Sequence, residues 1–271
     1  MSNMKITFLG SGNIARAIIR GLIANGTPAT DITAADPMQS ARDEAEKLGI
    51  NVTTDNRAAT RHADVVIIAV KPNVIKKIAK EIASSIGQKL LISVAAGIPS
   101  QLLRGSLGLE AHIIRCMPNT PAQIQSGITG LFATTVISKT EKKIAEKILG
   151  AVGKYIWVNN ETDLHAVTAV SGSGPAYFFY IIEALQKAAT QVGLDENLAR
   201  MLVIETAIGA AKMTLTETTK TAEQLRREVT SPGGTTAAAI SILEQGDLAG
   251  LLSQAVESAN ARSIELARDI T

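Results

Sequence analysis

The sequence is poor in cysteine, histidine and aromatic residues, and these shortages restrict the class of protein. The single cysteine, Cys116, cannot form a disulfide within the chain, which fits a reducing compartment such as the cytoplasm. The three histidines, His62, His112 and His165, show no metal-ligand spacing, so we expect no metal site. Basic and acidic residues are interspersed and leave a net charge of +2, which argues against a nucleic-acid-binding or membrane-binding face.

Long uncharged apolar runs are also missing, so no segment is expected to span a membrane. The first residues, MSNMKITFLG, lead directly into a strand-like run without the features of a signal peptide. With 46% hydrophobic and 19% charged residues, the 271-residue chain can bury a substantial core in one large domain or two ordinary ones. We therefore expect a soluble, globular, cytoplasmic protein.

The spacing of apolar residues changes near residue 160. Before this point, short β-branched runs alternate with amphipathic helical stretches, and near-continuous apolar strands of this kind are typical of a parallel sheet covered on both faces. The expected strands lie at 5–10, 31–36, 64–70, 89–97 and 112–118, with further short strands near 130–137 and 155–158.

After residue 161 the strand signal disappears, and stretches rich in alanine and leucine predict helices. Because their apolar residues lie on more than one face, we predict an obligate homodimer formed through this half of the chain. The helices are expected at 163–193, 194–217, 221–229, 236–246 and 247–270.

A glycine motif follows the first expected strand. Gly10, Gly12 and Ala15 in FLGSGNIA form the pattern GxGxxA at the start of a helix. Gly10 allows a tight turn, and Gly12 lets the backbone approach a pyrophosphate at the helix N-terminus. Within a βαβ series this motif predicts a dinucleotide-binding Rossmann domain with a doubly wound parallel sheet at residues 1–160, followed by an all-α domain at 161–271. The expected contacts of this loop with the cofactor are Gly10, Ser11, Gly12, Asn13 and Ile14.

Two polar residues are candidates for the adenosine end of the cofactor. Asp36 ends the second expected strand, 24 residues after Gly12, where an acidic residue commonly bonds the ribose and repels a 2′-phosphate. Because Pro37 and a helix follow, Asp36 can also be read as a helix cap. Asn56 opens the next helix and likewise has two readings, as an N-cap or as a donor to a 2′-oxygen or phosphate.

The ends of the later strands complete the expected cofactor site, because ligands of parallel sheets bind at the carboxyl ends of the strands. Small residues there let a flat nicotinamide or its ribose come close to the backbone. Lys71 has a plainer alternative as a solvated lysine at a helix start. The candidates are Ala69, Val70, Lys71 and Pro72, then Ala95, Ala96 and Gly97, and finally Asn119 in a stiff loop between two prolines.

Taken in order, GSGNIA, AVKP, SVAAGI, RCMPNTP, SGSGPAY and VTSPGGTT resemble the pyrroline-5-carboxylate reductase family. SPGGTT after SGSGPAY is far more specific than the glycine motif. The resemblance implies reduction of L-1-pyrroline-5-carboxylate to L-proline with NADPH or NADH, the last step of proline synthesis. It also implies a helical domain that interlocks with its partner in a homodimer, which can assemble into larger rings.

The resemblance gives the loop at 231–236 a role that its composition supports. Proline and two glycines break any helix there, and backbone N–H groups at a glycine-rich helix start can hold a carboxylate. The matching family loop binds the substrate carboxylate, and the threonine matching Thr236 faces the ring nitrogen, so Thr236 is the expected catalytic residue. The plain alternative is an interhelical loop whose threonine caps the next helix. The residues expected to bind the substrate are Ser231, Gly233, Gly234, Thr235 and Thr236.

SGSGPAY, at residues 171–177, lies inside an expected helix, and its glycines and proline predict a kink or interruption. The family reading is contact with the substrate or the partner subunit, and tight helix packing without a ligand is the alternative. The aromatic residues at 177–180 are expected to be part of the core rather than a stacking platform.

Two rival functions stay open. Another imine reductase or a 3-hydroxyacid dehydrogenase can share the two-domain arrangement, and the dehydrogenase would need a proton acceptor such as Lys212. A nucleotide-sensing module would keep GSGNIA but have no use for SPGGTT. Family members often prefer NADPH, whereas Asp36 would repel a 2′-phosphate, so the cofactor preference stays open, as do ring size, proline feedback and the range of imine substrates.

Overall fold

The computed structural model describes residues 4–270, so residues 1–3 and 271, at the outer ends of the two predicted domains, lie outside the described residues. The chain forms two compact units, Met1–Ser173 with Ser258–Thr271, and Gly174–Glu257. By its contacts the first unit extends to Ser173, because α7 (Asp163–Val167) packs on two strands of the sheet and Leu164 and Ala169 are buried. No helix within 4–270 is long and apolar enough to cross a membrane.

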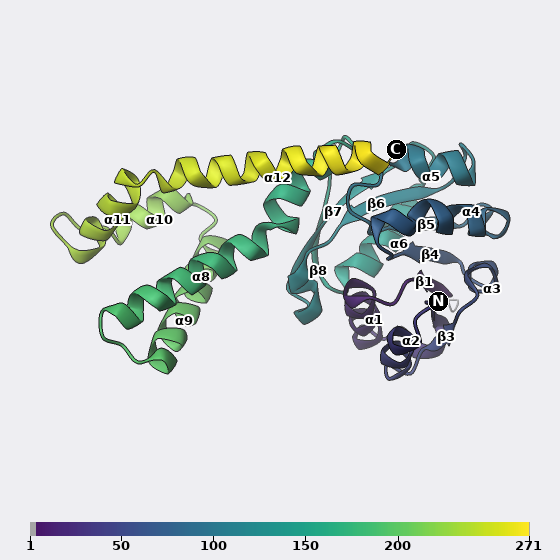
Figure 1. Cartoon of the computed structure of the whole chain (residues 1–271), viewed down its shortest axis with the longest axis horizontal. Coiled ribbons are helices and arrows are strands. Elements are labelled where there is room, and N and C mark those ends of the chain that lie inside the picture. The colour runs from purple at the N-terminus through teal and green to yellow at the C-terminus, as the bar shows by residue number, and fades with distance from the viewer. Residues whose placement is uncertain (1–3, 271) are drawn as a thin grey trace. The chain divides into compact units, whose positions relative to one another are not determined.

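An eight-stranded sheet forms the centre of the first unit, in the order β3-β2-β1-β4-β5-β6-β7-β8 (Figure 1). All neighbouring strands pair in parallel except β6 and β7, which are antiparallel because the chain returns directly after β6 without a crossover helix. This arrangement confirms the predicted doubly wound sheet and adds one antiparallel pair. The strands are β1 (Ile6–Leu9), β2 (Ile32–Ala35), β3 (Asn51–Thr53), β4 (Val65–Ile68), β5 (Leu90–Ser93), β6 (Ile113–Met117), β7 (Gly127–Ala133) and β8 (Gly153–Trp157).

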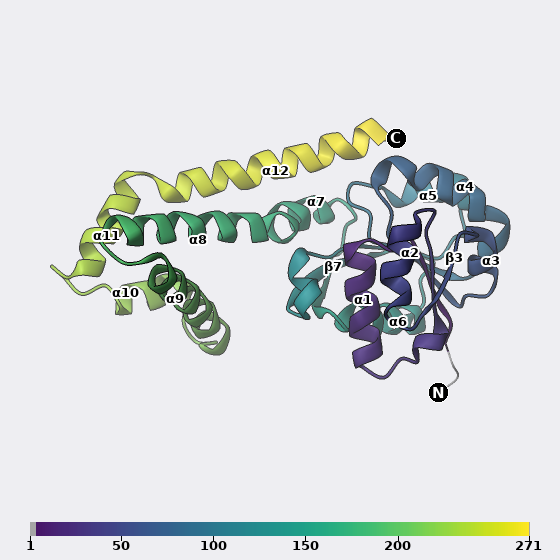
Figure 2. The same cartoon turned by 60° about the horizontal axis from the view of Figure 1, so that its bottom comes forward.

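Helices cover both faces of this sheet (Figure 2). Phe8 of β1 belongs to the core on one face and the next residue, Leu9, to the core on the other, as the alternation of side chains along a strand requires. The helices of the first face are α1 (Asn13–Ala24), α2 (Gln39–Glu46) and α6 (Lys139–Gly150). Those of the second face are α3 (Asn56–Arg61), α4 (Ile75–Ile86) and α5 (Ser100–Leu107).

A π-helical turn at Thr168–Gly172 separates α7 (Asp163–Val167) from α8 (Gly174–Gln191), which confirms the predicted interruption. A Cβ at Gly172 would lie 2.5 Å from Cε of Met117, so a larger residue there would displace the end of the Met117 side chain. The hydroxyls of Thr168 and Ser171 donate to backbone carbonyls four residues earlier, at 2.7 and 3.0 Å, which favours local departure from regular helix.

The second unit is entirely helical and has little core of its own. Within Gly174–Glu257, all of which the structure describes, Ala199 is the one buried hydrophobic side chain. Phe178, Phe179 and Tyr180 are 68%, 64% and 72% exposed, so their expected burial is wrong for the single chain, because α8 packs against α9 and leaves its other side open. The remaining helices are α9 (Glu196–Thr216), α10 (Ala222–Glu228), α11 (Thr235–Gln245) and α12 (Leu248–Ile270), whose last turns belong to the first unit.

Candidate active site

The structure brings the predicted cofactor residues to one edge of the sheet. β1 lies between β2 and β4, and the chain leaves it towards β2 and β3 on one side before returning to β4 on the other. A doubly wound sheet has its ligand crevice at such a reversal, beyond the carboxyl ends of the strands. The predicted residues follow β1 (residues 10–14), β2 (Asp36), β4 (residues 69–72), β5 (residues 95–97) and β6 (Asn119).

The glycine loop after β1 has the shape that a pyrophosphate requires. Gly10 has φ +95°, and a Cβ there would lie 2.6 Å from the backbone oxygen of Ala69. Gly12 is the N-cap of α1 without a side-chain cap, and a Cβ at Gly12 would meet no atom within 4 Å. The free N–H groups of α1 therefore face open space beside Gly12, which fits an anion at the helix N-terminus.

Asp36 makes contacts that neither sequence reading includes. Its Oδ2 accepts hydrogen bonds from the backbone N–H of Ser11 at 2.9 Å and from the Ser11 hydroxyl at 3.1 Å. Its Oδ1 accepts from the N–H of Met38 at 2.9 Å, and Met38 itself is the N-cap of α2. Asp36 thus braces the glycine loop from the end of β2, while Oδ1 keeps the capacity to accept a second hydrogen bond.

Two arginines lie beside Asp36, and sequence reasoning missed both. Arg42 donates from Nη1 to the backbone oxygen of Asp36 at 2.7 Å. Arg16 donates from Nη1 to the backbone oxygen of Ser11 at 2.7 Å and from Nη2 to Oδ1 of Asn13 at 2.8 Å. The sequence does contain a signal for them, because each arginine lies about one turn into the helix that follows β1 or β2. Arg42 thus contacts Asp36 directly, and Arg16 contacts Ser11, which Asp36 also holds.

Asn56 and Asn119 are both used within the fold. Asn56 is buried and donates from Nδ2 to Oε2 of Glu81 at 3.1 Å. It does not cap α3, because Asp55 is the N-cap and accepts from the N–H of Ala58. Asn119 accepts from the N–H of Ile128 through Oδ1 at 3.0 Å, which leaves its amide hydrogens for another partner.

The residues after β4 combine close packing with an exposed charge. The N–H of Ala69 donates to the backbone oxygen of Leu9 at 2.8 Å, which draws the end of β4 to the glycine loop. Lys71 is exposed and immediately precedes a 3₁₀ turn at Pro72–Val74. This position is compatible with both readings of Lys71, as a cofactor contact and as a solvated lysine.

The loop at 231–236 ends in an uncapped helix. Gly234 is the N-cap of α11 and has no side chain, so the reading in which a threonine caps this helix is wrong. The first intrahelical bond runs from the N–H of Ala238 to the oxygen of Gly234, so the N–H groups of 235–237 precede the hydrogen-bond ladder. Gly233 has φ +72°, and a Cβ at Gly234 would lie 2.6 Å from Oγ of Ser231. Hydroxyls and free N–H groups therefore gather at this helix start, and the hollow beside it is also lined by Arg226, Arg227 and Glu244.

His112, His165 and Cys116 make contacts within the fold rather than with the predicted site residues. Nδ1 of His112 lies 2.5 Å from Oε1 of Glu141, and Nδ1 of His165 lies 2.9 Å from the Ser263 hydroxyl. Burial, aided by the nearby positive charge of Arg115, lowers the pKa of His165. Burial raises the pKa of the Cys116 thiol, so it stays protonated and unreactive.

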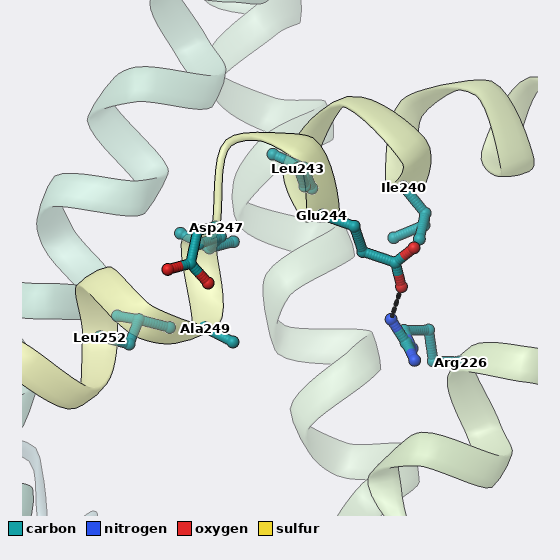
Figure 3. A pocket seen from close by; sticks show the side chains of 8 residues that line it. Arg226, Ile240, Leu243, Glu244, Asp247, Ala249 and Leu252 are labelled. Carbon is teal, nitrogen blue, oxygen red and sulfur yellow. Dashed lines mark hydrogen bonds and ion pairs between the residues drawn. The ribbon is translucent and has the colours of Figure 1, made fainter.

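The second unit also has a hollow away from the loop at 231–236. It has a volume of about 450 Å³, and its lining is mainly apolar around an Arg226–Glu244 ion pair at 2.8 Å (Figure 3). None of its lining residues is a predicted site residue. They are Arg226, Ile240, Leu243, Glu244, Asp247, Leu248, Ala249 and Leu252, from α10, α11, the turn before α12 and α12.

Comparisons with known proteins match two separate parts of the chain. The family model described as "Pyrroline-5-carboxylate reductase dimerisation" matches residues 161–266, and one described as "NADP oxidoreductase coenzyme F420-dependent" matches residues 5–97. The pyrroline-5-carboxylate reductase of Pseudomonas aeruginosa is 42% identical and covers 100% of this chain and 99% of its own.

Solved structures extend the similarity to the whole fold. A pyrroline-5-carboxylate reductase from Coxiella burnetii superposes with a TM-score of 0.92 at 45% identity, covering 98% of this chain and 99% of its own. A pyrroline carboxylate reductase from Plasmodium falciparum, with NADP bound, superposes with a TM-score of 0.89 at 29% identity, with the same coverage of 98% and 99%.

Proposed function

Since this chain belongs to the pyrroline-5-carboxylate reductase family, it is an NAD(P)H-dependent oxidoreductase that reduces L-1-pyrroline-5-carboxylate to L-proline, and we propose which residues perform this reaction. This activity is supported by the similarity to reductases of this family over their full length. The uncapped start of α11 after SPGGTT carries our assignment of the substrate carboxylate.

The cofactor binds along the carboxyl edge of the sheet. Its pyrophosphate lies at the N-terminus of α1, where Gly10 and Gly12 leave room and the free N–H groups donate to it. The nicotinamide lies towards the small residues after β5, at 95–97, with Asn119 at its far side. When bound, the reduced nicotinamide supplies a hydride to the imine carbon. The chain itself contributes binding, orientation and exclusion of water.

We propose that the adenosine end accepts NADPH although it carries Asp36. Both carboxylate oxygens of Asp36 already accept hydrogen bonds from the glycine loop or from Met38, which disperses their charge. The Arg42 guanidinium donates to the backbone oxygen of Asp36 and the Arg16 guanidinium to that of Ser11. Both groups can pair with a 2′-phosphate. A reductase of the same family, from Plasmodium falciparum, was solved with NADP bound, which supports this reading. Oδ1 of Asp36 can still accept from a ribose hydroxyl, so NADH is also used.

The substrate carboxylate is held at the start of α11. The N–H groups of Thr235 and Thr236 have no partner within the helix, and the helix dipole favours an anion there. The Ser231 hydroxyl adds a donor beside Gly234, where any larger residue would displace it. The hydroxyl of Thr236 faces the ring nitrogen. Because a protonated imine is already electrophilic, the site needs no strong general acid, and its main contribution is positioning.

A steady-state assay with L-1-pyrroline-5-carboxylate and each reduced cofactor tests the activity directly. We expect turnover with both cofactors and a higher kcat/KM with NADPH. The rival dehydrogenase reading predicts oxidation of a 3-hydroxyacid that depends on Lys212, an exposed residue of α9. Absence of imine reduction, together with activity on a hydroxyacid that Lys212→Met abolishes, would establish that rival instead.

We further propose a cytoplasmic homodimer that can assemble into a larger ring. The dimerisation family model covers the helices whose apolar side chains stay exposed in the single chain, which supports assembly through them. A single buried cysteine and the use of a reduced nicotinamide cofactor favour the cytoplasm. Light scattering on the purified protein gives the size of the assembly.

A further inference from the structure

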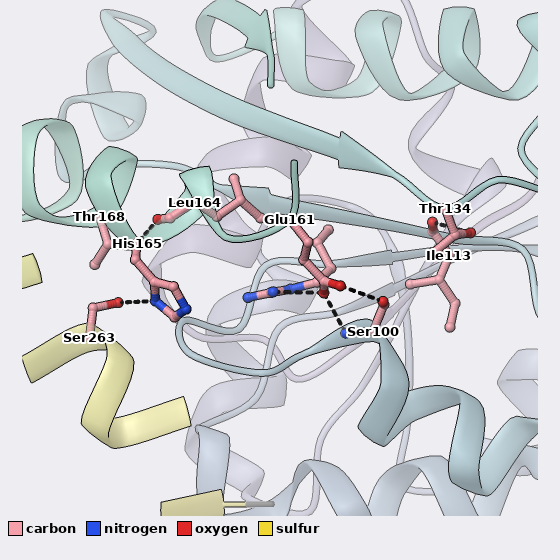
Figure 4. A network of polar contacts seen from close by, with 9 residues as sticks. Ser100, Ile113, Thr134, Glu161, Leu164, His165, Thr168 and Ser263 are labelled. Atoms are coloured by element: carbon pink, nitrogen blue, oxygen red, sulfur yellow. Dashed lines mark hydrogen bonds and ion pairs between the residues drawn. The ribbon is translucent and has the colours of Figure 1, made fainter. Parts of the chain in front are cut away.

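Glu161 joins three parts of the first unit through one carboxylate. Its Oε1 accepts from the backbone N–H of Ser100 at 2.5 Å and from Nη1 of Arg115 at 2.8 Å, and its Oε2 accepts from the Ser100 hydroxyl at 2.8 Å (Figure 4). Ser100 is the first residue of α5, and Arg115 belongs to β6. Glu161 itself precedes α7 and is the first residue that the dimerisation family model matches.

The network is buried enough for its charges to matter. Arg115 is 6% exposed, and its neighbours in β6 are the apolar residues of the core. Without the Glu161 carboxylate, a guanidinium would be left buried and unpaired, and the N-terminus of α5 would lose its acceptor, since the N-cap Pro99 offers no side-chain cap. The carboxylate is therefore the shared hydrogen-bond partner that connects the start of α5 to β6.

The segment between β5 and α5 is the one expected to meet the nicotinamide. It runs from β5 through Ala95, Ala96 and Gly97 to Ser100, where Glu161 holds it. Its other support is α12, because a Cβ at Gly97 would lie 3.7 Å from both the Ala267 nitrogen and Cβ of Leu266. Gly97 has φ +71°, so its backbone conformation is one that other residues rarely adopt.

A second contact ties α12 to the same network. His165, on α7, lies with Nδ1 2.9 Å from the hydroxyl of Ser263 on α12 (Figure 4). His165 follows Glu161 by four residues. On α12, Ser263 and Ala267 are also four residues apart, which is about one helical turn. The loop at 95–100 is thus supported from two sides by residues that follow position 160 in the sequence.

We propose that Glu161 is a positioning residue for the nicotinamide, through which the start of the helical segment sets the conformation of the loop at 95–100. It touches neither substrate nor cofactor and acts through Ser100. This inference rests on the proposed function, because it takes Ala95 to Gly97 as the nicotinamide side of the site. Loss of the carboxylate should leave the pyrophosphate and adenosine contacts unchanged while the loop becomes free to move.

The test compares two ligands that differ in the nicotinamide ring. Isothermal titration calorimetry gives Kd for NADPH and for 2′-phospho-ADP-ribose, which has the adenosine and pyrophosphate but no ring. For Glu161→Gln we expect the Kd of NADPH to rise about tenfold, which is roughly the effect of losing one hydrogen bond. The Kd of 2′-phospho-ADP-ribose should change less than about twofold. KM for NADPH should rise with it, while kcat at saturating cofactor changes less.

Three variants serve as controls. Glu110→Gln removes an exposed carboxylate of the same unit and should change neither Kd. Glu161→Asp keeps the charge beside Arg115 but is too short to reach Ser100 as well, so it should show the same selective loss with little change in Tm. It also decides the question if Glu161→Gln fails to fold. Glu161→Gln with Arg115→Met removes the unpaired charge, and here we expect Tm to recover while the selective loss for NADPH persists.

Two results would overturn the proposal. Equal weakening of both ligands by Glu161→Asp would mean that Glu161 only stabilises the fold. Recovery of NADPH affinity in the double variant would mean that the unpaired Arg115, rather than the lost hold on Ser100, caused the effect. Failure of the wild type to reduce L-1-pyrroline-5-carboxylate would instead refute the proposed function, so the two failures are distinguishable.

Discussion

The two units contain similar apolar residues but use them differently. In the sheet unit, Ile6, Phe8, Ile18 and Ile67 are buried completely or almost completely, and helices close both faces of the sheet. In the helical unit, residues such as Phe178, Ile242 and Leu251 are more than half exposed. The first unit completes its core within one chain, whereas the second leaves much of its apolar surface exposed in the single chain.

In the proposed homodimer, assembly would therefore complete the fold of the helical unit but not that of the sheet unit. Burying a large apolar side chain contributes about 1.5–3 kcal/mol, so a handful from each subunit can outweigh the cost of association. The nucleotide-binding half should then be insensitive to changes at the helical surface, and the helical half should depend on its partner. The following experiments test that contrast, from the largest expected effect to the smallest.

Placing a charge on the exposed face of α8 should have the largest effect. Phe179→Asp would bury an unpaired carboxylate in the dimer, so we expect association to weaken by at least about a hundredfold and activity to be lost at micromolar protein. Light scattering and the imine-reduction assay measure this. Leu109→Asp, at a 77% exposed position of the sheet unit, is the matched control and should be silent. An active dimer of the Phe179→Asp protein would refute our account of this surface.

Removing the hydroxyl of Thr236 should impair chemistry and leave both units folded. We expect Thr236→Val to lower kcat/KM by about tenfold or more, because a donor near the reacting nitrogen disappears with little change in volume. Thr236→Ser keeps the hydroxyl and should retain most of the activity. Cofactor affinity and dimer mass should match the wild type. Unchanged kinetics in Thr236→Val would remove this residue from the site.

Changes at the adenosine end should affect cofactor choice without affecting assembly. Asp36→Ser removes a negative charge near the 2′-phosphate, so we expect the ratio of kcat/KM for NADPH over NADH to rise about fivefold. Both absolute values should fall, since Ser11 loses its brace. Arg42→Met should move the ratio in the opposite direction. A strong wild-type preference for NADPH that neither substitution alters would contradict both assignments.

The smallest effect concerns acid stability of the sheet unit. Burial acts to raise the pKa of Glu161, but the Ser100 hydrogen bonds and the Arg115 guanidinium outweigh it and hold that pKa below its usual 4.5. The stabilisation is therefore present above about pH 4.5 and is lost as pH falls through the folded-state pKa. We expect the Tm of Glu161→Gln to be about 2–5 °C lower than that of the wild type at pH 7, and the difference to shrink as the pH falls below the usual pKa of a glutamate. A difference that persists in acid would exclude the ionised carboxylate as its cause.

The fold of the sheet unit was predictable where local pattern is strong. β1, β2 and β4 are β-branched apolar runs, and Gly10 sits where only glycine tolerates both the φ and the approach of Ala69. β3 was missed because Asn51–Thr53 is a three-residue edge strand of mixed polarity that depends on pairing with β2. α5 was missed because its eight residues include a glycine and carry little periodicity.

The site was predictable where one residue type is required and unpredictable where distant residues meet. Asp36 reaches Ser11 across 25 positions only after β1 and β2 have paired. Arg115 and Glu161 are 46 positions apart, although an arginine inside the apolar run HIIRCMP signals that some buried partner exists. The exposed aromatics of α8 show the same limit, since hydrophobicity predicts burial but not whether the same chain provides it.

The π-helical turn at Thr168–Gly172 sets the rotational phase of α8. Each residue of a regular α-helix advances about 100° around the axis, so the length of this turn decides in which direction every later side chain points. Removing one residue from it would turn Phe178 and Phe179 by about 100° without changing either side chain. In the proposed homodimer, the length of this turn would therefore decide which face of α8 meets the partner, and insertions or deletions there should be tolerated less well than substitutions.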